Sequence, residues 1–169
     1  MAAQVIAAPE YVDVSTPIIF LAGPIQGAYD WQSDAIKLIQ RNSPYLHIAN
    51  PRRPGEAKGN FSEKDYGEQV DWETYYLRRA AKDGAIMFWL AKEFEHKCER
   101  AYAQTSRFEL GEWKIRHERD GIKLVIGIEE GFTNKRYITR RLSQDCPNIN
   151  ICSSLEETCN EVGRLFYQW

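Results

Sequence analysis

The sequence lacks the patterns that mark disulfide-rich, metal-binding and membrane-spanning proteins. It has four cysteines but no Cys-x-x-Cys pair, and a chain of 169 residues can bury a core without disulfides. Its three histidines are spread over three segments without the spacing of metal ligands. No apolar run approaches the ~20 residues of a membrane-spanning helix, and the N-terminus has no basic region followed by a long apolar stretch. We therefore expect a soluble, cytoplasmic protein with reduced cysteines and no bound metal.

An excess of positive charge is also missing. Lys and Arg number 22 against 24 Asp and Glu, which gives a formal net charge of -2. The pairs Arg78-Arg79 and Arg140-Arg141 are isolated, which is typical of solvated helix faces rather than of a nucleic-acid interface. Hydrophobic residues make up 43% and charged residues 27% of the chain, as in an ordinary globular domain. This composition predicts one folded domain that binds neither nucleic acid nor a membrane.

Short apolar runs alternate with helical patterns along the chain. The runs predict strands at residues 18–22, 46–49, 85–90, 124–128 and 149–151. Helices are expected at residues 31–41, 62–82, 106–120, 135–144 and 154–167. Strands that alternate with helices pair in parallel through right-handed crossovers. We therefore predict an α/β fold, a flavodoxin-like three-layer sandwich whose five-stranded parallel sheet has the order 2-1-3-4-5.

The chain is expected to divide into an N-terminal arm and one domain. Residues 1–16 mix alanine, proline and polar residues without a period, which predicts an extended arm. Residues 17–169 would form a single domain, because the segment shows no linker, internal repeat or low-complexity stretch.

In a sheet of this kind, ligands bind beside the carboxyl ends of the strands. Four segments fall on that rim: the loop Gly23-Pro24-Ile25-Gln26-Gly27, residues 50–53, the loop after Trp89, and the helix start near Glu109. The first loop has neither the phosphate-loop pattern nor the three-glycine dinucleotide spacing, which disfavours ATP or NAD binding through it. It forms either a tight turn or a ligand contact, since its two glycines allow close approach to the backbone.

Glu109 follows a predicted helix start. Ser106 is the candidate N-cap, and Glu109 lies three residues later, where the first-turn amides favour a negative charge and keep a carboxylate ionised. An ionised carboxylate at this place on the rim is a candidate nucleophile. The same spacing is also a capping box, in which the glutamate only satisfies backbone donors.

Asp71-Trp72-Glu73 places two carboxylates beside an aromatic ring on the second predicted helix. Desolvated neighbouring carboxylates raise each other's pKa, so that one of them can remain protonated and act as an acid. Residues two apart point to different sides of a helix, however, so at least one of the two is expected in solvent. Trp89 and other aromatic residues could either stack on a flat heterocycle or belong to the core.

Five motifs follow one another between about Ile18 and Glu157. They are Phe20-Leu21-Ala22-Gly23-Pro24, Asn50-Pro51-Arg52-Arg53-Pro54, Trp72-Glu73-Thr74, the strand to Trp89, and Arg107-Phe108-Glu109-Leu110-Gly111-Glu112-Trp113. In this order and spacing they resemble the nucleoside 2-deoxyribosyltransferase family, in particular its branch of shorter deoxyribosyltransferase-like proteins.

The resemblance implies a covalent mechanism. Glu109, in its Glu-Leu-Gly context, would attack the anomeric carbon of a 2'-deoxynucleoside and release the base. A deoxyribosyl ester would remain until a second nucleobase attacks it, so that two displacements retain the configuration. Glu73, or Asp71 in its place, would hold or protonate the departing base. No cofactor is expected, and the resemblance implies a homo-oligomer, because family members often complete their sites across subunits.

The first loop favours a nucleoside over a nucleotide. Related nucleotide N-glycosidases bind a 5'-phosphate through backbone amides of this loop, whereas Pro24 lacks an amide donor and Gln26 brings no charge. Arg52, Arg53 or Arg107 could still clamp a phosphate from another direction. The candidate substrate-binding residues are Gly23, Pro24, Ile25, Gln26, Asn50, Arg52, Trp72, Trp89 and Arg107.

Two other functions remain open at this point. An N-glycosidase would share the first displacement and then use water as the acceptor, which depends on how well the site excludes water. A non-catalytic nucleotide-sensing domain would keep the fold without turnover.

Overall fold

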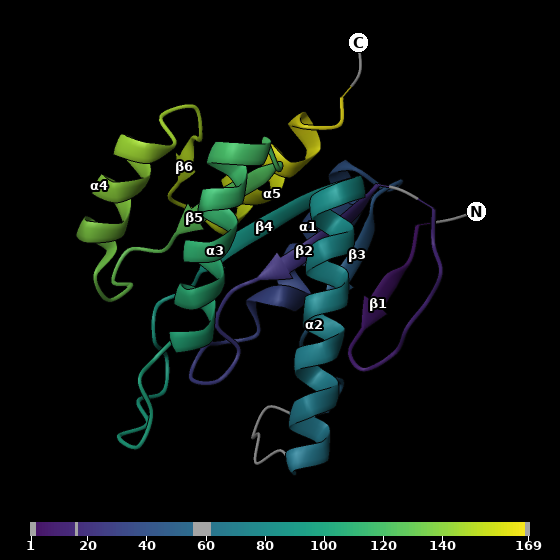
Figure 1. Ribbon diagram of the computed structural model, residues 1–169, viewed down its shortest axis with the longest axis horizontal. Coiled ribbons are helices and arrows are strands. Elements are labelled where there is room, and N and C mark those ends of the chain that lie inside the picture. The colour runs from purple at the N-terminus through teal and green to yellow at the C-terminus, as the bar shows by residue number, and fades with distance from the viewer. Residues whose placement is uncertain (1–2, 16, 56–61, 168–169) are drawn as a thin grey trace.

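The apolar runs of the sequence form a parallel sheet with helices packed on both faces, as the computed structural model shows for residues 3–15, 17–55 and 62–167 (Figure 1). The strands are β1 (Val5–Ala7), β2 (Ile18–Ala22), β3 (His47–Asn50), β4 (Gly84–Leu90), β5 (Leu124–Ile128) and β6 (Ile151–Cys152). The helices are α1 (Trp31–Asn42), α2 (Glu63–Asp83), α3 (Gln104–Asp120), α4 (Lys135–Asp145) and α5 (Leu155–Arg164). Among the described residues, no helix is long and apolar enough to cross a membrane.

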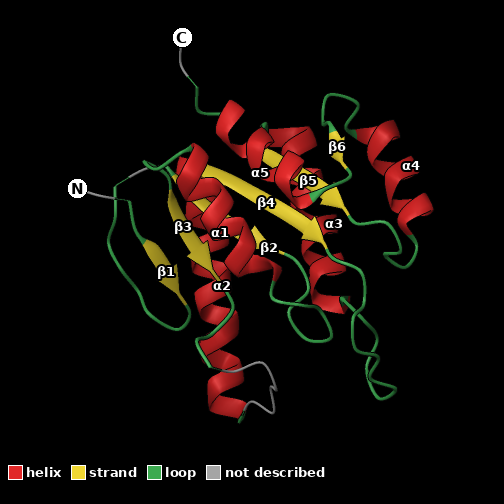
Figure 2. Cartoon of the chain, turned by 180° about the vertical axis from the view of Figure 1, so that it is seen from behind, coloured by secondary structure: helices red, strands yellow, loops and turns green. Residues whose placement is uncertain are grey.

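The sheet has six strands in the order β1-β3-β2-β4-β5-β6, and every pairing is parallel. The five predicted strands have the predicted relative order, but the prediction of a five-stranded sheet is wrong. The sixth strand, β1, lies within the segment predicted as an arm and pairs with β3 at the edge of the sheet (Figure 2). A strand of three residues is too short to show the alternation by which strands are recognised in a sequence.

The two faces of the sheet carry separate cores, because successive strand residues point to opposite sides. On one face Phe20 and Phe88 pack with Trp72 and Tyr76 of α2, and the core continues under α3 and α4. On the other face Ile19 and its neighbours pack with α1 and α5. Continuous apolar strands are required here because both faces are covered.

Three of the predicted helix starts are confirmed. Asp30, Ser62 and Ser154 cap α1, α2 and α5, and each side chain accepts a hydrogen bond from the backbone N–H three residues later. Gly121 ends α3 in the left-handed conformation, with φ of 72°, at the end predicted for this helix.

The N-terminal segment is tied to the domain by side chains that reach it from β3 and α2. His47 accepts a hydrogen bond from the Gln4 N–H at Nδ1 (3.0 Å), and its Nε2 lies 3.3 Å from the Ser15 hydroxyl. Trp72 donates its indole N–H to the Glu10 carbonyl (2.6 Å). His47 is buried, and burial together with the charge of Arg79 lowers the pKa of its imidazole. The folded environment therefore favours the neutral form of this ring.

We expect β1 to lose its attachment in acid. Because the folded pKa of His47 lies below the unfolded value of about 6.5, its contribution to stability is present above that value and is lost as the pH falls through the folded pKa. Urea unfolding between pH 8 and pH 5 should show a steeper loss of unfolding free energy for the wild type than for His47→Asn, whose amide oxygen accepts the same N–H without titrating. His96→Asn, at an exposed histidine, is the control. Identical pH dependence in wild type and His47→Asn would contradict this assignment.

Candidate active site

A cavity of about 440 Å³ lies at the carboxyl ends of β2, β3 and β4, where the strand order places a crevice. Its volume falls in the range of small-molecule sites, about 300–1,000 Å³. It is lined by Ala22 at the end of β2, residues 23–27 after that strand, residues 51–53 after β3, parts of the loop before α3, and one face each of α2 and α3. Of the candidate residues, the cavity brings together Glu109 and Glu73 with Gly23, Pro24, Ile25, Gln26 and Arg52.

The loop at residues 23–27 is held in place by its neighbours. Gly23 has φ of 152°, and a Cβ atom there would lie 2.2 Å from the Trp89 carbonyl oxygen, so only glycine fits. The Pro24 carbonyl accepts the indole N–H of Trp31 (2.8 Å). The Gly27 carbonyl accepts the N–H groups of residues 94 and 95, at 2.7 and 3.1 Å, which joins this loop to the one after β4. The cavity wall is therefore preformed.

Arg52, which lines the cavity, also holds that loop in place. Its guanidinium donates to the Gln32 side chain at 3.0 Å and to the carbonyls of Ile25 and Tyr29 at 3.4 and 3.3 Å. It also forms an ion pair of 3.2 Å with Asp30. Since these donors are directed at protein acceptors, the structure supports a role for Arg52 in positioning the loop.

The start of α3 differs from the prediction. The helix begins at Gln104, and its N-cap is Ala103 in the left-handed conformation, with φ of 56° and no side-chain cap. Ser106 is buried inside the first turn, so the predicted Ser106 cap and the capping box with Glu109 are wrong. Glu109 consequently lies in the second turn, beyond the amides that would have stabilised its charge.

Glu109 is half-buried and lines the cavity. Burial, followed by the neighbouring carboxylates of Glu73 and Glu112, raises its pKa to about 8. The prediction that the helix start keeps this carboxylate ionised is therefore wrong for the empty site. At neutral pH the carboxyl of Glu109 is largely protonated.

Glu73 reaches the same cavity from α2. Burial raises its pKa, while a hydrogen bond from the Gln69 amide (2.8 Å) and the charge of Arg53 oppose part of that rise. Two carboxyls thus share a poorly solvated space, where ionisation of one disfavours ionisation of the other.

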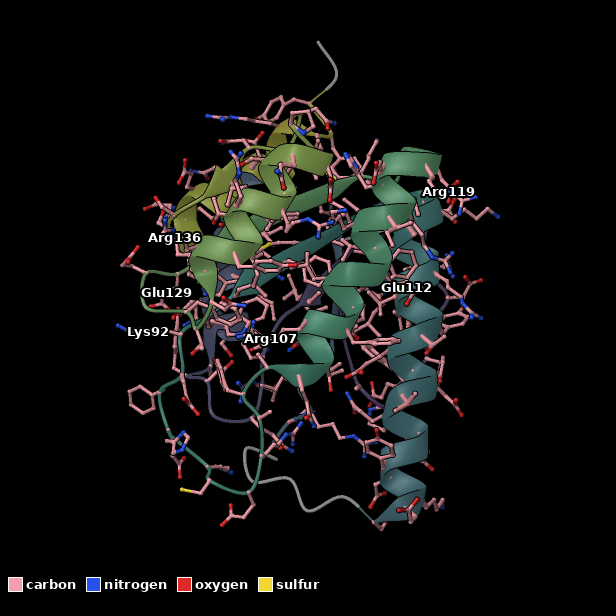
Figure 3. The ribbon with its side chains drawn as sticks, turned by 60° about the vertical axis from the view of Figure 1, so that its left-hand side comes forward. Lys92, Arg107, Glu112, Arg119, Glu129 and Arg136 are labelled. Carbon is pink, nitrogen blue, oxygen red and sulfur yellow. The ribbon has the colours of Figure 1, made fainter. Side chains whose placement is uncertain are left out.

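A second cavity, of about 420 Å³, lies between α2 and α3 and is also lined by Glu73 and Glu109. Its other walls include Tyr66, Val70 and Phe108, which are largely exposed to solvent. Figure 3 shows Glu112, another wall residue, on the side of α3 that faces α2. The two carboxyls therefore stand where the cavities meet.

Five candidate residues lie outside the described lining of the main cavity. Asp71 is exposed on the other side of α2, as expected for a residue two positions from Glu73. Trp72 and Trp89 are buried in the two cores. Asn50 uses its side-chain oxygen to accept the Arg52 N–H at 3.1 Å. Arg107 stacks on the Phe132 ring and donates to the Thr133 carbonyl at 2.8 Å, away from α2 (Figure 3).

The sequence placed the loop after Trp89 on the rim but identified neither Gln69 nor the individual residues of that loop. Gln69 lies four residues before Glu73, a spacing that places two side chains on one helix face and could have revealed the pair. Glu93, Glu95 and Tyr102 line the cavity from a loop whose course no periodic pattern predicts. In the part of the chain that the structure describes, no group of three or more metal-ligating side chains could hold an ion.

The arrangement can carry out acid and nucleophilic chemistry at one centre. Two carboxyls with raised pKa values that compete for one charge provide, in the same state, one ionised and one protonated group. Such a pair is suited to a substitution at carbon in which a leaving group must be protonated.

A comparison with models of protein families matches residues 16–132 to the family described as nucleoside 2-deoxyribosyltransferase like. The match covers well over half of the chain and includes the loop at residues 23–27, Glu73 and Glu109. A comparison with curated proteins finds no match.

We expect Glu109 to destabilise the fold when it ionises. Its pKa is raised from the unfolded value of about 4.3 to about 8, so wild-type stability is lost as the pH rises through this window, whereas Glu109→Gln keeps it. At pH 8.5 the variant should be more stable than the wild type by on the order of 2 kcal/mol. The full linkage value is about 1.4 kcal/mol per pKa unit, and it is reduced here because solvent relaxes around a half-buried group. Urea unfolding at pH 5 and pH 8.5 measures the difference.

The control for this measurement is Glu68→Gln, an exposed glutamate of α2. Its stability should follow that of the wild type within about 0.5 kcal/mol at both pH values. No gain for Glu109→Gln at pH 8.5 would show that the carboxyl of Glu109 is well solvated.

Proposed function

Because this chain belongs to the nucleoside 2-deoxyribosyltransferase-like family, we propose that it is an enzyme that cleaves the N-glycosidic bond of 2'-deoxynucleosides and transfers the deoxyribosyl group to another nucleobase. The observation that carries the proposal is the meeting of Glu109 and Glu73, from two different helices, in one cavity beside a preformed loop. Retaining glycosidases use a pair of carboxyls in the same way, one as nucleophile and one as acid and base.

In the first displacement, the Glu109 carboxylate attacks the anomeric carbon of the sugar. The C1'–N bond breaks, and its electron pair goes to the departing base, which takes a proton from Glu73. The product is a deoxyribosyl ester of Glu109 with an ionised Glu73. A carboxylate suits this role because it stabilises an oxocarbenium-like transition state and is itself a competent leaving group.

In the second displacement, the acceptor base gives its N–H proton to Glu73. Its nitrogen then attacks C1', the ester C–O bond breaks, and the Glu109 carboxylate is released. Both half-reactions use the same two groups, so the site returns to its starting state with one proton shared between them.

The raised pKa values support this cycle. Attack requires an ionised Glu109 and a protonated Glu73, which together hold one proton. In the proposed cycle the pair holds one proton, because a second ionisation would bring two like charges together in a partly desolvated site. Exchange of the proton between the partners then produces the reactive form without uptake from solvent.

A nucleoside is supported over a nucleotide by the three arginines that the sequence offered as a phosphate clamp, although Lys97 and Arg100 also line the cavity. Arg52 donates to the loop carbonyls, Arg107 to the Thr133 carbonyl, and Arg53 to Gln69 and the Asp65 carbonyl. Pro24 provides no amide donor at the first loop. The 5'-hydroxyl of a nucleoside needs no cationic clamp, which agrees with this distribution of donors.

Hydrolysis is a second candidate, favoured by the exposure of the rim. Gln104, Thr105 and Arg100 line the main cavity and are exposed to solvent. Water that reaches the glycosyl ester would replace the acceptor base and release free deoxyribose.

Substitution of Glu109 should abolish formation of the covalent ester. We expect Glu109→Gln to lower kcat at least about 10³-fold, because a neutral amide is a poor nucleophile, while the protein remains folded. Mass spectrometry of the wild type quenched with a deoxynucleoside should detect a protein species heavier by one deoxyribosyl group, and the variant should lack it. Asp71→Asn is the matched control and should retain activity, because its side chain lies outside the cavity. Full activity of Glu109→Gln would remove the proposed nucleophile.

Product analysis separates the candidate functions. We expect incubation with a deoxynucleoside and a second free base to yield a new deoxynucleoside, because the open cavity admits the acceptor. Free deoxyribose as the sole sugar product would indicate a hydrolase. Binding without turnover would indicate a sensing domain. Parallel reactions with the 5'-monophosphate should be slower, and a preference for the monophosphate would contradict the inferred nucleoside substrate.

A further inference from the structure

Gln69 is a buried polar side chain one helical turn before Glu73, on the cavity side of α2. Its amide nitrogen Nε2 donates to the Glu73 carboxyl oxygen Oε1 (2.8 Å) and to the Pro51 carbonyl (2.8 Å). Its oxygen Oε1 accepts the Nε–H of Arg53 (2.9 Å). All the polar atoms of this side chain therefore have partners.

These partners leave one orientation for the amide. Arg53 can only donate, so it must face the amide oxygen, and the Pro51 carbonyl can only accept, so it must face the amide nitrogen. A flipped amide would place N–H against N–H and oxygen against oxygen. Gln69 thus presents a donor to Glu73 in every state of the site that keeps these contacts.

The donor makes the two oxygens of Glu73 unequal. Oε1 is occupied by the Gln69 N–H, so a proton on Glu73 resides on Oε2, the oxygen left for the cavity. The carboxyl of Glu109, by contrast, has no hydrogen bond within the described part of the chain. When one charge is shared, this asymmetry favours its location on Glu73 in the empty site.

We propose that Gln69 is a positioning residue of the transfer reaction: it directs Oε2 of Glu73 toward the substrate and stabilises the ionised Glu73 that must take the proton of the incoming acceptor. The inference rests on the proposed function, in which esterification of Glu109 leaves Glu73 as the base. During the second displacement the acceptor N–H bond breaks, its proton moves to Oε2, and its nitrogen forms the new bond to C1'.

Arg53 strengthens this effect from the loop after β3. It donates to the Gln69 oxygen and to the Asp65 carbonyl (3.1 Å), so its positive charge polarises the amide that contacts Glu73. Asp65, Gln69 and Glu73 follow one another at intervals of four along one face of α2. The other charged groups that line the two cavities with Glu73 are of both signs: Arg52, Arg53, Lys97 and Arg100, and Glu63, Glu93, Glu95, Glu109 and Glu112.

The test replaces Gln69 with methionine, which has a similar shape and no N–H donor. Rapid-quench experiments would follow formation of the glycosyl ester from a deoxynucleoside and its breakdown by an acceptor base or water, at pH 5 to 9. We expect the rising limb of the breakdown rate to move up by about one pH unit, because loss of the donor raises the pKa of Glu73. On the rising limb, breakdown at a given pH should be about tenfold slower, a consequence of that shift.

Two controls separate positioning from packing. Gln144→Leu, at an exposed glutamine of α4, should leave both rates and both pH profiles unchanged. Ester formation from a nucleoside with an activated base, which departs without protonation, should change little in Gln69→Met. Equal losses in both half-reactions with an unshifted pH profile would overturn the inference and leave Gln69 as a packing residue only.

The titration of Glu73, measured without turnover, tests the role of Gln69 independently of the proposed function. In the Glu109→Gln background, carbon NMR of labelled glutamate reports the titration of Glu73, which should move to higher pH when Gln69→Met is added. An unmoved titration overturns the role of Gln69 even if the wild type transfers deoxyribose. If the titration moves but the wild-type protein turns over no deoxynucleoside, the proposed function is refuted together with the catalytic role of Gln69 that rests on it.

Discussion

The site depends on one electrostatic constraint: two carboxyl groups share a volume that water solvates poorly. Glu109 from α3 and Glu73 from α2 both have raised pKa values, and the cavity makes a second negative charge costly. The neighbouring groups treat the two carboxyls differently. Gln69 and Arg53 support a charge on Glu73, whereas nothing within the described residues donates to the carboxyl of Glu109. In the proposed reaction, Glu109 is therefore the carboxyl that stays protonated in the empty site, and it ionises when the substrate binds.

Most of the architecture could be predicted from the sequence, because buried parallel strands are continuous apolar runs and helix ends carry local chemical signals. Residues 18–22 and 85–90 illustrate the first point, and the caps at Asp30, Ser62 and Ser154 illustrate the second. The edge strand β1 was missed because three residues carry no period. Its place in the sheet is determined by distant partners, among them His47 and Trp72.

The position of the site could be predicted from the sequence, but the raised pKa of Glu109 could not. Strand ends gather at one rim of a parallel sheet, so Glu109 and the loop at residues 23–27 could be placed together from the sequence. The start of α3 could not be predicted, because Ser106 has the same sequence pattern as Ser62 and Ser154, which do cap their helices. Only the left-handed backbone at Ala103 reveals that the helix begins two residues earlier. That displacement removes Glu109 from the amide dipoles and reverses the expected effect on its pKa.

The short edge strand has a consequence for handling the protein. β1 covers the open side of β3, and the sheet ends on both sides in strands of only three and two residues, β1 and β6. Short edges offer few free backbone groups to another chain. A truncation that removes the first ten residues would expose the backbone edge of β3 together with the apolar surface that Ile6 and Ala8 now cover, and would create a template for intermolecular strand pairing. Fusion partners and proteolytic trimming are therefore better placed at the other terminus.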